Sequence, residues 1–323
     1  CAEAQNYCDR RGEITCVISP HGLSVKRFGK EVTMKITMAH GSGGRETGQL
    51  IREIFEANFH NEVLDKMEDS AVVEGSGRLA MTTDSFVVDP LFFPGGDIGR
   101  LCVCGTVNDL LMSGAVPKYL TCGFIIEEGA DGEALARIAA SMAETAAEAG
   151  VLIVAGDTKV VEGKGGMFIN TAGVGFLPEG VCVSASACRE GDAVLVSGFL
   201  GEHHAAILSS RMGIENEIRS DCAPLGEMVS AMRQAGVRVH AMRDVTRGGL
   251  ATVLSEFARS SGCCVELSQE ALPVSVPVKG FCGLLGLDPL YMGNEGKMTA
   301  VVDAADAQLA LACMKKSRYG ENA

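Results

Sequence analysis

No apolar run in the sequence approaches the roughly 20 residues that a membrane-spanning helix needs, although 47% of its 323 residues are hydrophobic. Basic residues are also few, because 28 Lys and Arg stand against 41 Asp and Glu, and the formal net charge is −13. With no stripe of cations to meet phosphates, neither a nucleic-acid surface nor a membrane segment is expected. Internal repeats and low-complexity segments are absent too. The length suggests about two domains.

The C-x-x-C spacing is missing, although the chain has 13 cysteines. The closest pairs are Cys102 with Cys104, and Cys263 with Cys264. Without that spacing the cysteines resemble neither a zinc site nor a disulfide framework. Most stand among apolar neighbours, where a free thiol behaves as a small buried hydrophobe. We therefore predict reduced thiols and a cytoplasmic protein.

Residues 1–33 lack any clear helical or strand period. They also lack an apolar segment followed by a cleavage site of small residues, so a secretory signal is not expected. The stretch "MKITMAHGSGG", which begins at Met34, looks like a natural start. We predict that residues 1–33 are an extension that is disordered or not native.

Strands and helices alternate from Met34 to about Cys188. Runs rich in β-branched residues predict strands at 78–88, 119–126, 151–156 and 167–177. Two helices are predicted between them, one from about residue 98 and one at 132–150. A second series predicts a strand within 189–198, helices at 202–212, 224–235, 248–261 and 304–316, and strands near 264–268 and 298–303. We therefore predict an α/β (α+β) chain with domains at 34–188 and 189–323.

The stretch "CGTVNDLLMSGA" (104–115) places Asn108 on the apolar stripe of the first helix, with Asp109 beside it. A buried carboxylate without a partner costs several kcal/mol, on the order of the whole stability of a domain. Asn108 alone is compatible with a core amide bonded to neighbouring backbone. Asp109, however, requires a partner that the helix itself does not supply.

Other carboxylates lie near strand ends. Asp84 lies near the end of the first predicted strand, Asp157 follows "VLIVAG", and Asp69 precedes the first strand. Ligands gather at the carboxyl ends of strands in α/β sheets, and converging carboxylates need a cation, for which Mg²⁺ is suited. Each signal alone is also compatible with an ordinary turn. By the same reasoning, His203 and His204 are interpreted as helix-start residues.

Glycines accompany these acids. The stretch "HGSGGRETGQLI" (40–51) places Gly41, Ser42, Gly43 and Gly44 immediately before a predicted helix, where free backbone N–H groups can bind phosphate. Gly156 precedes Asp157 in "AGDTKVV". A glycine-rich stretch before a helix is more often a simple turn, so the combination with the acids carries the hypothesis.

Together these motifs resemble a known family. The stretches "AHGSGG", "TTDSFVVDPLFFPGGDIGRL", "GTVNDLLMSGA", "AGDTKVV", "RDVTRGG" and "GNEGK" are similar to the HypE family of hydrogenase maturation factors, within the PurM-like superfamily of AIR synthase. The resemblance covers residues 34–323. It implies a PurM-like two-domain fold, a homodimer formed by pairing of the N-terminal sheets, and an ATP site beside that sheet. By position, it assigns ATP and Mg²⁺ to Gly41, Ser42, Gly43, Gly44, Asp69, Asp84, Asn108, Asp109, Gly156, Asp157 and Thr158, with the four aspartates as metal ligands.

The resemblance also implies a reaction. In this family HypF carbamoylates the cysteine of a C-terminal Pro-Arg-Ile-Cys tail, and ATP-dependent dehydration converts the thiocarboxamide to a thiocyanate. The cyanide then passes to iron on the HypC–HypD complex, for nickel–iron hydrogenase. Phosphorylation makes the amide oxygen a good leaving group, and removal of the nitrogen's protons completes the nitrile. We assign Lys159 to the phosphate or amide oxygen and Glu295 to the base.

One feature departs from the family, because no Pro-Arg-Ile-Cys tail follows "GENA". We expect either that the sequence continues or that the chain keeps the nucleotide site without its own substrate thiol. Cys313 lies in an amphipathic segment and is not assigned the role of the tail. Two alternatives stay open: another PurM-like ATP enzyme, of the selenophosphate synthetase or thiamine-phosphate kinase type, and a non-catalytic nucleotide-binding scaffold.

Overall fold

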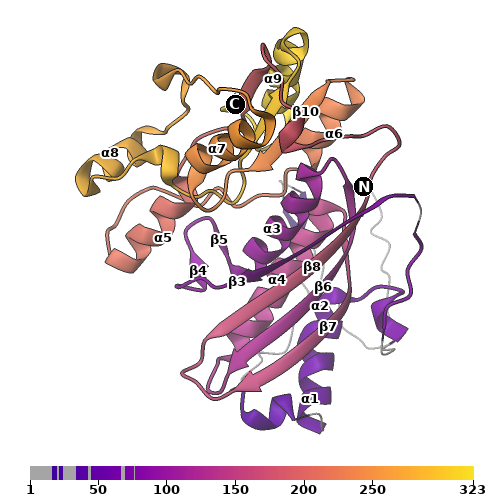
Figure 1. Cartoon of the computed structure of the whole chain (residues 1–323). Helices are drawn as coiled ribbons and strands as arrows, with labels where there is room; N and C mark the ends of the chain where they lie inside the picture. The colour runs from indigo at the N-terminus through magenta and orange to yellow at the C-terminus, as the bar shows by residue number, and fades with distance from the viewer. Residues whose placement is uncertain (1–16, 20–21, 25–33, 43–44, 67–69, 76) are drawn as a thin grey trace.

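A four-stranded mixed sheet organises the first half of the chain (Figure 1). The computed structural model describes residues 17–19, 22–24, 34–42, 45–66, 70–75 and 77–323. Across the sheet the strands are β3 (Leu79–Phe86), β8 (Met167–Phe176), β6 (Val116–Glu127) and β7 (Leu152–Val161). β8 is antiparallel to both of its neighbours, and β6 is parallel to β7. All four strands were predicted from the sequence.

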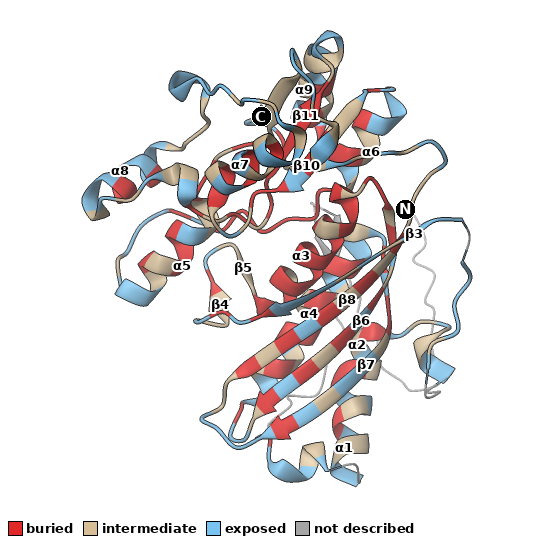
Figure 2. Ribbon diagram, viewed as in Figure 1, coloured by how far each residue is buried: buried red, intermediate tan, exposed pale blue. Residues whose placement is uncertain are grey.

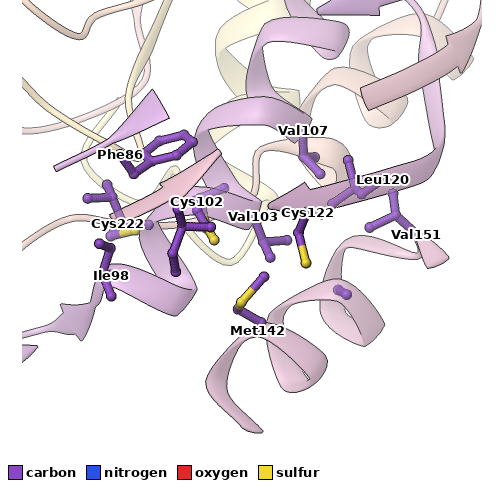
Figure 3. Close-up of a cluster of buried hydrophobic side chains, with 14 of the residues drawn as sticks. Phe86, Ile98, Cys102, Val103, Val107, Leu120, Cys122, Met142, Val151 and Cys222 are labelled. Carbon is purple, nitrogen blue, oxygen red and sulfur yellow. The ribbon is translucent and has the colours of Figure 1, made fainter. Parts of the chain in front are cut away.

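Two helices cover one face of this sheet, α3 (Ile98–Met112) and α4 (Gly132–Ala149). Both begin where the sequence supplies a cap: the Asp97 carboxylate accepts the N–H groups of Gly99 and Arg100, and Asp131 accepts that of Glu133. Between helices and sheet lies a core of aliphatic, aromatic and thiol side chains (Figure 3).

No helix of the described residues covers the other face of the sheet, as Figures 1 and 2 show. Several large apolar side chains on it are exposed to solvent: Met81 (74%), Ile125 (47%), Leu152 (45%) and Val161 (37%). These side chains share that face because residues two apart in a strand point the same way and paired residues lie side by side. We call this surface the open face.

The second half is built on a three-stranded antiparallel sheet of β10 (Val239–Asp244), β11 (Met298–Val302) and β9 (Ala193–Val196), in that order. Its helices are α5 (Glu202–Met212), α6 (Gly226–Gln234), α7 (Gly249–Ser261), α8 (Val276–Leu285) and α9 (Ala307–Lys316). The mixed α/β class was predicted correctly. The boundary at residue 188 stays a prediction.

Helix α3 also joins the two halves through one arginine. The Arg100 guanidinium donates to the carbonyl of Cys222 (2.8 Å), to Glu148 of α4 (2.9 Å) and to the Tyr319 hydroxyl (3.1 Å). Tyr319 in turn donates to the Glu148 carboxylate. We call Arg100, Glu148 and Tyr319 the clasp, because they fasten α3 and α4 to the end of the second half.

Some elements differ from the sequence-based prediction. No strand forms at 264–268, whereas β10 and α8 were not predicted. β1 (Val17–Ser19) pairs with β2 (Gly22–Ser24) in the segment for which no regular structure was predicted. The short elements also include α1 (Arg45–Leu50), a π-helical turn (Ile51–Glu56), α2 (Ala57–Phe59), β4 (Phe92–Phe93), β5 (Gly96–Asp97) and several 3-10 turns. Within the described ranges no helix has the length and apolar character to span a membrane.

Candidate active site between the two sheets

A cavity of about 440 Å³ lies between the two halves of the chain. β3 and α3 supply one wall, and α5, the end of β10 and the loop before β11 supply the other. Acidic side chains from both walls line it: Asp84, Asp109, Asp244 and Glu295. Two acids predicted for the nucleotide site and the predicted base therefore share one cavity.

A glycine brings α3 close enough to β3 for these acids to meet. A Cβ atom on Gly105 would lie 2.7 Å from the ring of Phe86, so no larger residue fits there without movement. The same atom would lie 3.9 Å from the Asp84 carboxylate. One turn further along α3, Asp109 accepts a hydrogen bond from the Thr82 hydroxyl at 2.9 Å. Asp84 and Asp109 thus face the same space.

Burial and neighbouring charges raise the pKa of three of these acids. Burial raises the pKa of Asp109, and the charge of Asp84 adds to this, against the hydrogen bond from Thr82. Burial and the charge of Asp109 raise the pKa of Asp244 from 3.8 to about 7. Burial and neighbouring carboxylates also raise the pKa of Glu295 well above its ordinary value. The cavity is therefore an unfavourable place for anions unless a cation enters.

Mg²⁺ fits part of this set. Among the described residues, no three His, Cys, Asp or Glu side chains are grouped as a ready metal site. Mg²⁺ is commonly held by one or two carboxylates together with substrate phosphates. Asp84 and Asp109 match that requirement, because both are oxygen donors whose mutual repulsion a cation relieves. Any Mg²⁺ at this wall would take its remaining ligands from phosphate and water.

Cationic and neutral nitrogen groups line the rest of the cavity: His203, His204, Arg211 and Arg247. The two histidines begin α5, as predicted from the sequence. Burial lowers the pKa of His203 to about 4, so its ring is neutral at pH 7, and its Nδ1 lies 2.8 Å from the Ser220 hydroxyl. The positive charge of Arg247 lowers the proton affinity of Glu295. The cavity thus has an acidic wall and a nitrogen-rich wall.

Asn108 does not face this cavity, contrary to the expectation. It is 2% exposed, its amide nitrogen donates to the carbonyl of Ala223 at 3.0 Å, and its amide oxygen accepts the N–H of Leu225 at 2.9 Å. Both ends of the amide are therefore used by backbone groups of the second half. Asn108 therefore binds α3 to the loop before α6, and it is not among the residues that line the cavity.

Asp157 lies apart from Asp84 and Asp109 within one protomer. β7 and β3 are opposite edges of the sheet, so three strand spacings, roughly 14 Å, separate them. Asp157 lies in the cross-strand row of Ser85, one row from Asp84, and adjacent rows point to opposite faces. One Mg²⁺ cannot bind both carboxylates in a single protomer.

The other residues predicted for the nucleotide gather around β7. Gly156, Asp157 and Thr158 line a second cavity of about 160 Å³, which is mostly apolar. Gly41 packs against β7, because a Cβ atom on it would lie 2.6 Å from the Val160 nitrogen, and Ser42 follows it. Lys159 is on the open face, away from Glu295. Gly43, Gly44 and Asp69 lie outside the described residues.

Comparison with known proteins identifies the family of this chain. Residues 67–177 match the model of the AIR synthase related protein N-terminal domain, and residues 189–322 match that of its C-terminal domain. The chain is 51% identical over 295 residues to carbamoyl dehydratase HypE of Cupriavidus necator, covering 90% of this chain and 84% of that protein. The corresponding protein of Escherichia coli is 48% identical, covering 89% and 88%. The chain belongs to the HypE family.

Solved HypE structures agree with the fold. HypE in complex with ATP superposes with a TM-score of 0.87 at 46% identity, covering 88% of this chain and 87% of that one. A HypE–HypF complex gives 0.74 at 49% identity, covering 84% and 90%. Thiamine-monophosphate kinase from Stenotrophomonas maltophilia is only 20% identical at a TM-score of 0.61, which shows the fold alone. The predictions of the HypE family, of its carbamoyl dehydratase class and of the fold are confirmed.

Sequence reasoning missed part of the site. Asp244 and Arg247 belong to the motif "RDVTRGG", which contributed to the resemblance without receiving a role. Asp244 is 8% exposed at the end of β10, a strand that was not predicted, so its place on the cavity had no sequence signal apart from the motif. His203 and His204 were correctly placed at a helix start, but their position on the cavity was not foreseen.

Proposed function

We propose that this HypE-family protein is an ATP-dependent carbamoyl dehydratase, which converts a carbamoylated C-terminal cysteine to a thiocyanate for the maturation of nickel–iron hydrogenase. The observation that supports this most directly is the cavity in which Asp84 and Asp109 face Glu295. A nucleotide phosphate with Mg²⁺ fits the two aspartates, and a base near the phosphate suits the elimination that follows phosphorylation.

The reaction has two stages. The amide oxygen of the thiocarboxamide attacks the γ-phosphorus of ATP, and ADP leaves. Loss of the phosphorylated oxygen as phosphate, with removal of the two nitrogen protons, then leaves the carbon–nitrogen triple bond. The net change is loss of one water from the substrate, taken up in the conversion of ATP to ADP and phosphate. When bound, Mg²⁺ would neutralise phosphate charge.

Residues of this chain have separate tasks in that scheme. Asp84 and Asp109 would hold the Mg²⁺ that accompanies the nucleotide phosphates. Glu295 takes a proton from nitrogen, a task favoured by the burial that raises its pKa. The neutral His203 ring and the Arg247 guanidinium lie in the same cavity and can contact the amide or phosphate oxygens.

We further propose a homodimer in which two open faces meet. The exposed apolar side chains there are unusual for a surface in contact with water and suit a covered interface. Each protomer also carries two half-sites on opposite edges of its sheet, with Asp84 at β3 and Asp157 at β7. Pairing that brings β7 of one protomer to β3 of the other would supply Asp157 and Lys159 of the partner subunit to the cavity.

The complete site can be tested by mixing two inactive variants. Asp84→Asn and Asp157→Asn homodimers should each bind ATP weakly, because every site has lost one carboxylate. In a mixed dimer, one of the two sites would combine the intact Asp84 with the intact Asp157, so half of the sites should recover magnesium-dependent ATP binding by calorimetry. No recovery in a mixed dimer verified by mass spectrometry would refute the shared site.

HypF is the proposed carbamoyl donor, supported by the solved HypE–HypF complex of a relative. The HypC–HypD complex is the proposed acceptor of cyanide. The described cysteines are all free thiols, which suits a reducing, cytoplasmic environment. To test the activity, the chain is extended with a C-terminal Pro-Arg-Ile-Cys segment and carbamoylated by HypF. Loss of one water mass on addition of ATP is expected, and its absence despite ATP binding would overturn the proposal.

A further inference from the structure

The loop that carries Glu295 is held by one buried carboxylate. The Asp221 side chain is fully buried, its Oδ1 accepts the N–H of Glu295 at 3.1 Å, and its Oδ2 accepts the N–H of Gly296 at 3.3 Å. In return, the carbonyl of Glu295 accepts the N–H of Ala223 at 3.4 Å. The backbone on both sides of Glu295 is therefore bound to the same short loop, residues 221–223.

The two loops approach each other as closely as backbones can. A Cβ atom on Gly296 would lie 1.9 Å from the carbonyl oxygen of Asp221, so any side chain there would push the loops apart. The charge of Asp221 is offset by Lys297, whose Nζ lies 3.8 Å from Oδ2 and whose side chain is 9% exposed. Such a buried pair is costly to form and is poor evidence of stability alone. Its position beside Glu295 calls for a functional explanation.

The loop of residues 221–223 is in turn held by a residue from the first half of the chain. Asn108 of α3 binds the carbonyl of Ala223 and the N–H of Leu225. The next residue on the helix, Asp109, lines the cavity. Helix α3 therefore carries Asp109, a candidate nucleotide-site carboxylate. Its neighbour on the same helix, Asn108, binds the loop that holds Glu295, the candidate base.

We propose that Asp221 is a positioning residue for Glu295, which fixes the backbone of residues 295 and 296 so that the Glu295 carboxyl reaches the cavity. The inference rests on the proposed function of Glu295 as the base. Asp221 acts a second way, through its charge. The charged groups that face Glu295 are Asp221, Asp244, Asp84 and Arg247, and after burial Asp221 is the largest influence that raises its pKa. Removing that charge makes Glu295 a weaker base.

The test measures ATP-dependent water loss from the chain with the added, carbamoylated Pro-Arg-Ile-Cys segment, as a first-order rate across pH. Asp221→Asn keeps the size of the side chain and removes its charge. We expect a rate at least about tenfold lower. The rising limb of the pH profile should move to lower pH by roughly one unit, because a like charge next to Glu295 is gone. Affinity for ATP should be unchanged.

Two further variants separate positioning from mere folding. Asp221→Glu keeps the charge but displaces the loop, so the pH midpoint should return toward that of the parent while the rate stays low. Asp192→Asn is the matched control, because Asp192 is also largely buried and accepts bonds from the Arg189 N–H (2.7 Å) and His240 (2.8 Å), away from the cavity. It should change neither the rate nor the profile.

The outcomes are distinct. If the parent protein loses no water although it binds ATP, the proposed function fails. If the parent reacts and Asp221→Asn reacts at the same rate with the same pH midpoint, the positioning role is refuted. Should Asp221→Asn fail to fold, Asp221→Glu decides, because a rate equal to that of the parent would refute the positioning of Glu295 by Asp221.

Discussion

Replacing Asp244 by asparagine should stabilise the protein at alkaline pH when Mg²⁺ and nucleotide are absent. Asp244 is 8% exposed, and burial together with the charge of Asp109 raises its pKa from 3.8 to about 7. A raised pKa in the folded state favours the protonated carboxyl. Its contribution to stability is therefore complete below about pH 4 and is lost as pH rises through 7.

The rise in the pKa of Asp244 from 3.8 to about 7 corresponds to on the order of 4 kcal/mol of free energy of unfolding, since one pKa unit is worth about 1.4 kcal/mol. An asparagine side chain cannot ionise, so Asp244→Asn should escape this loss. The free energy of unfolding, from urea titrations at a series of pH values, should match that of the parent near pH 4 and exceed it by up to that amount at pH 8.

Two results would refute the reasoning. One is that the free energy of unfolding of the parent, measured relative to that of Asp244→Asn at the same pH, does not fall between pH 5 and pH 8. The other is a variant with no gain at pH 8. Adding Mg²⁺ and ATP is the internal control, because a cation among the carboxylates should reduce the difference between parent and Asp244→Asn.

Three more changes test other parts of the structure. Asp109→Asn should make ATP binding nearly independent of Mg²⁺ in calorimetry, and an unchanged magnesium-dependent affinity would contradict the role of that carboxylate. Met81→Glu places a charge on the open face and should yield monomers in sedimentation velocity at micromolar concentration, whereas an intact dimer would argue against that interface. Asn108→Ala removes the partners of two buried backbone groups and should lower the free energy of unfolding by about 2–4 kcal/mol in urea titrations; a loss below about 0.5 kcal/mol would show that the loop is held by other contacts.

The sequence predicted elements best where local signals agree. The helix from Ile98 has its cap at Asp97, and α4 has Asp131 at its start and Gly150, at φ 69°, at its end. β10 was missed because "VHAMRD" carries charged residues and becomes a strand only by pairing with β11. The segment 264–268 alternates as a strand does, but no neighbouring strand pairs with it.

The site was predictable in part for a related reason. Asp84 and Asp109 converge because β3 and α3 pack together, a local relation that their spacing indicates. Asp157 follows a strand in the same way, but its strand lies at the far edge because β8 and β6 intervene. The partners of Asn108 lie 115 and 117 residues further along the chain, beyond any local pattern.

The clasp has a consequence for the order in which the protein is made. Arg100 and Glu148 emerge from the ribosome long before Tyr319, and at ordinary rates of synthesis the interval is on the order of ten seconds or more. During that time the first sheet can fold with its helices, while the arginine still lacks its tyrosine partner and the second wall of the cavity is being synthesised. Closure of the clasp therefore comes after both walls of the cavity have been made, because Glu295, the last residue in the chain that lines the cavity, precedes Tyr319.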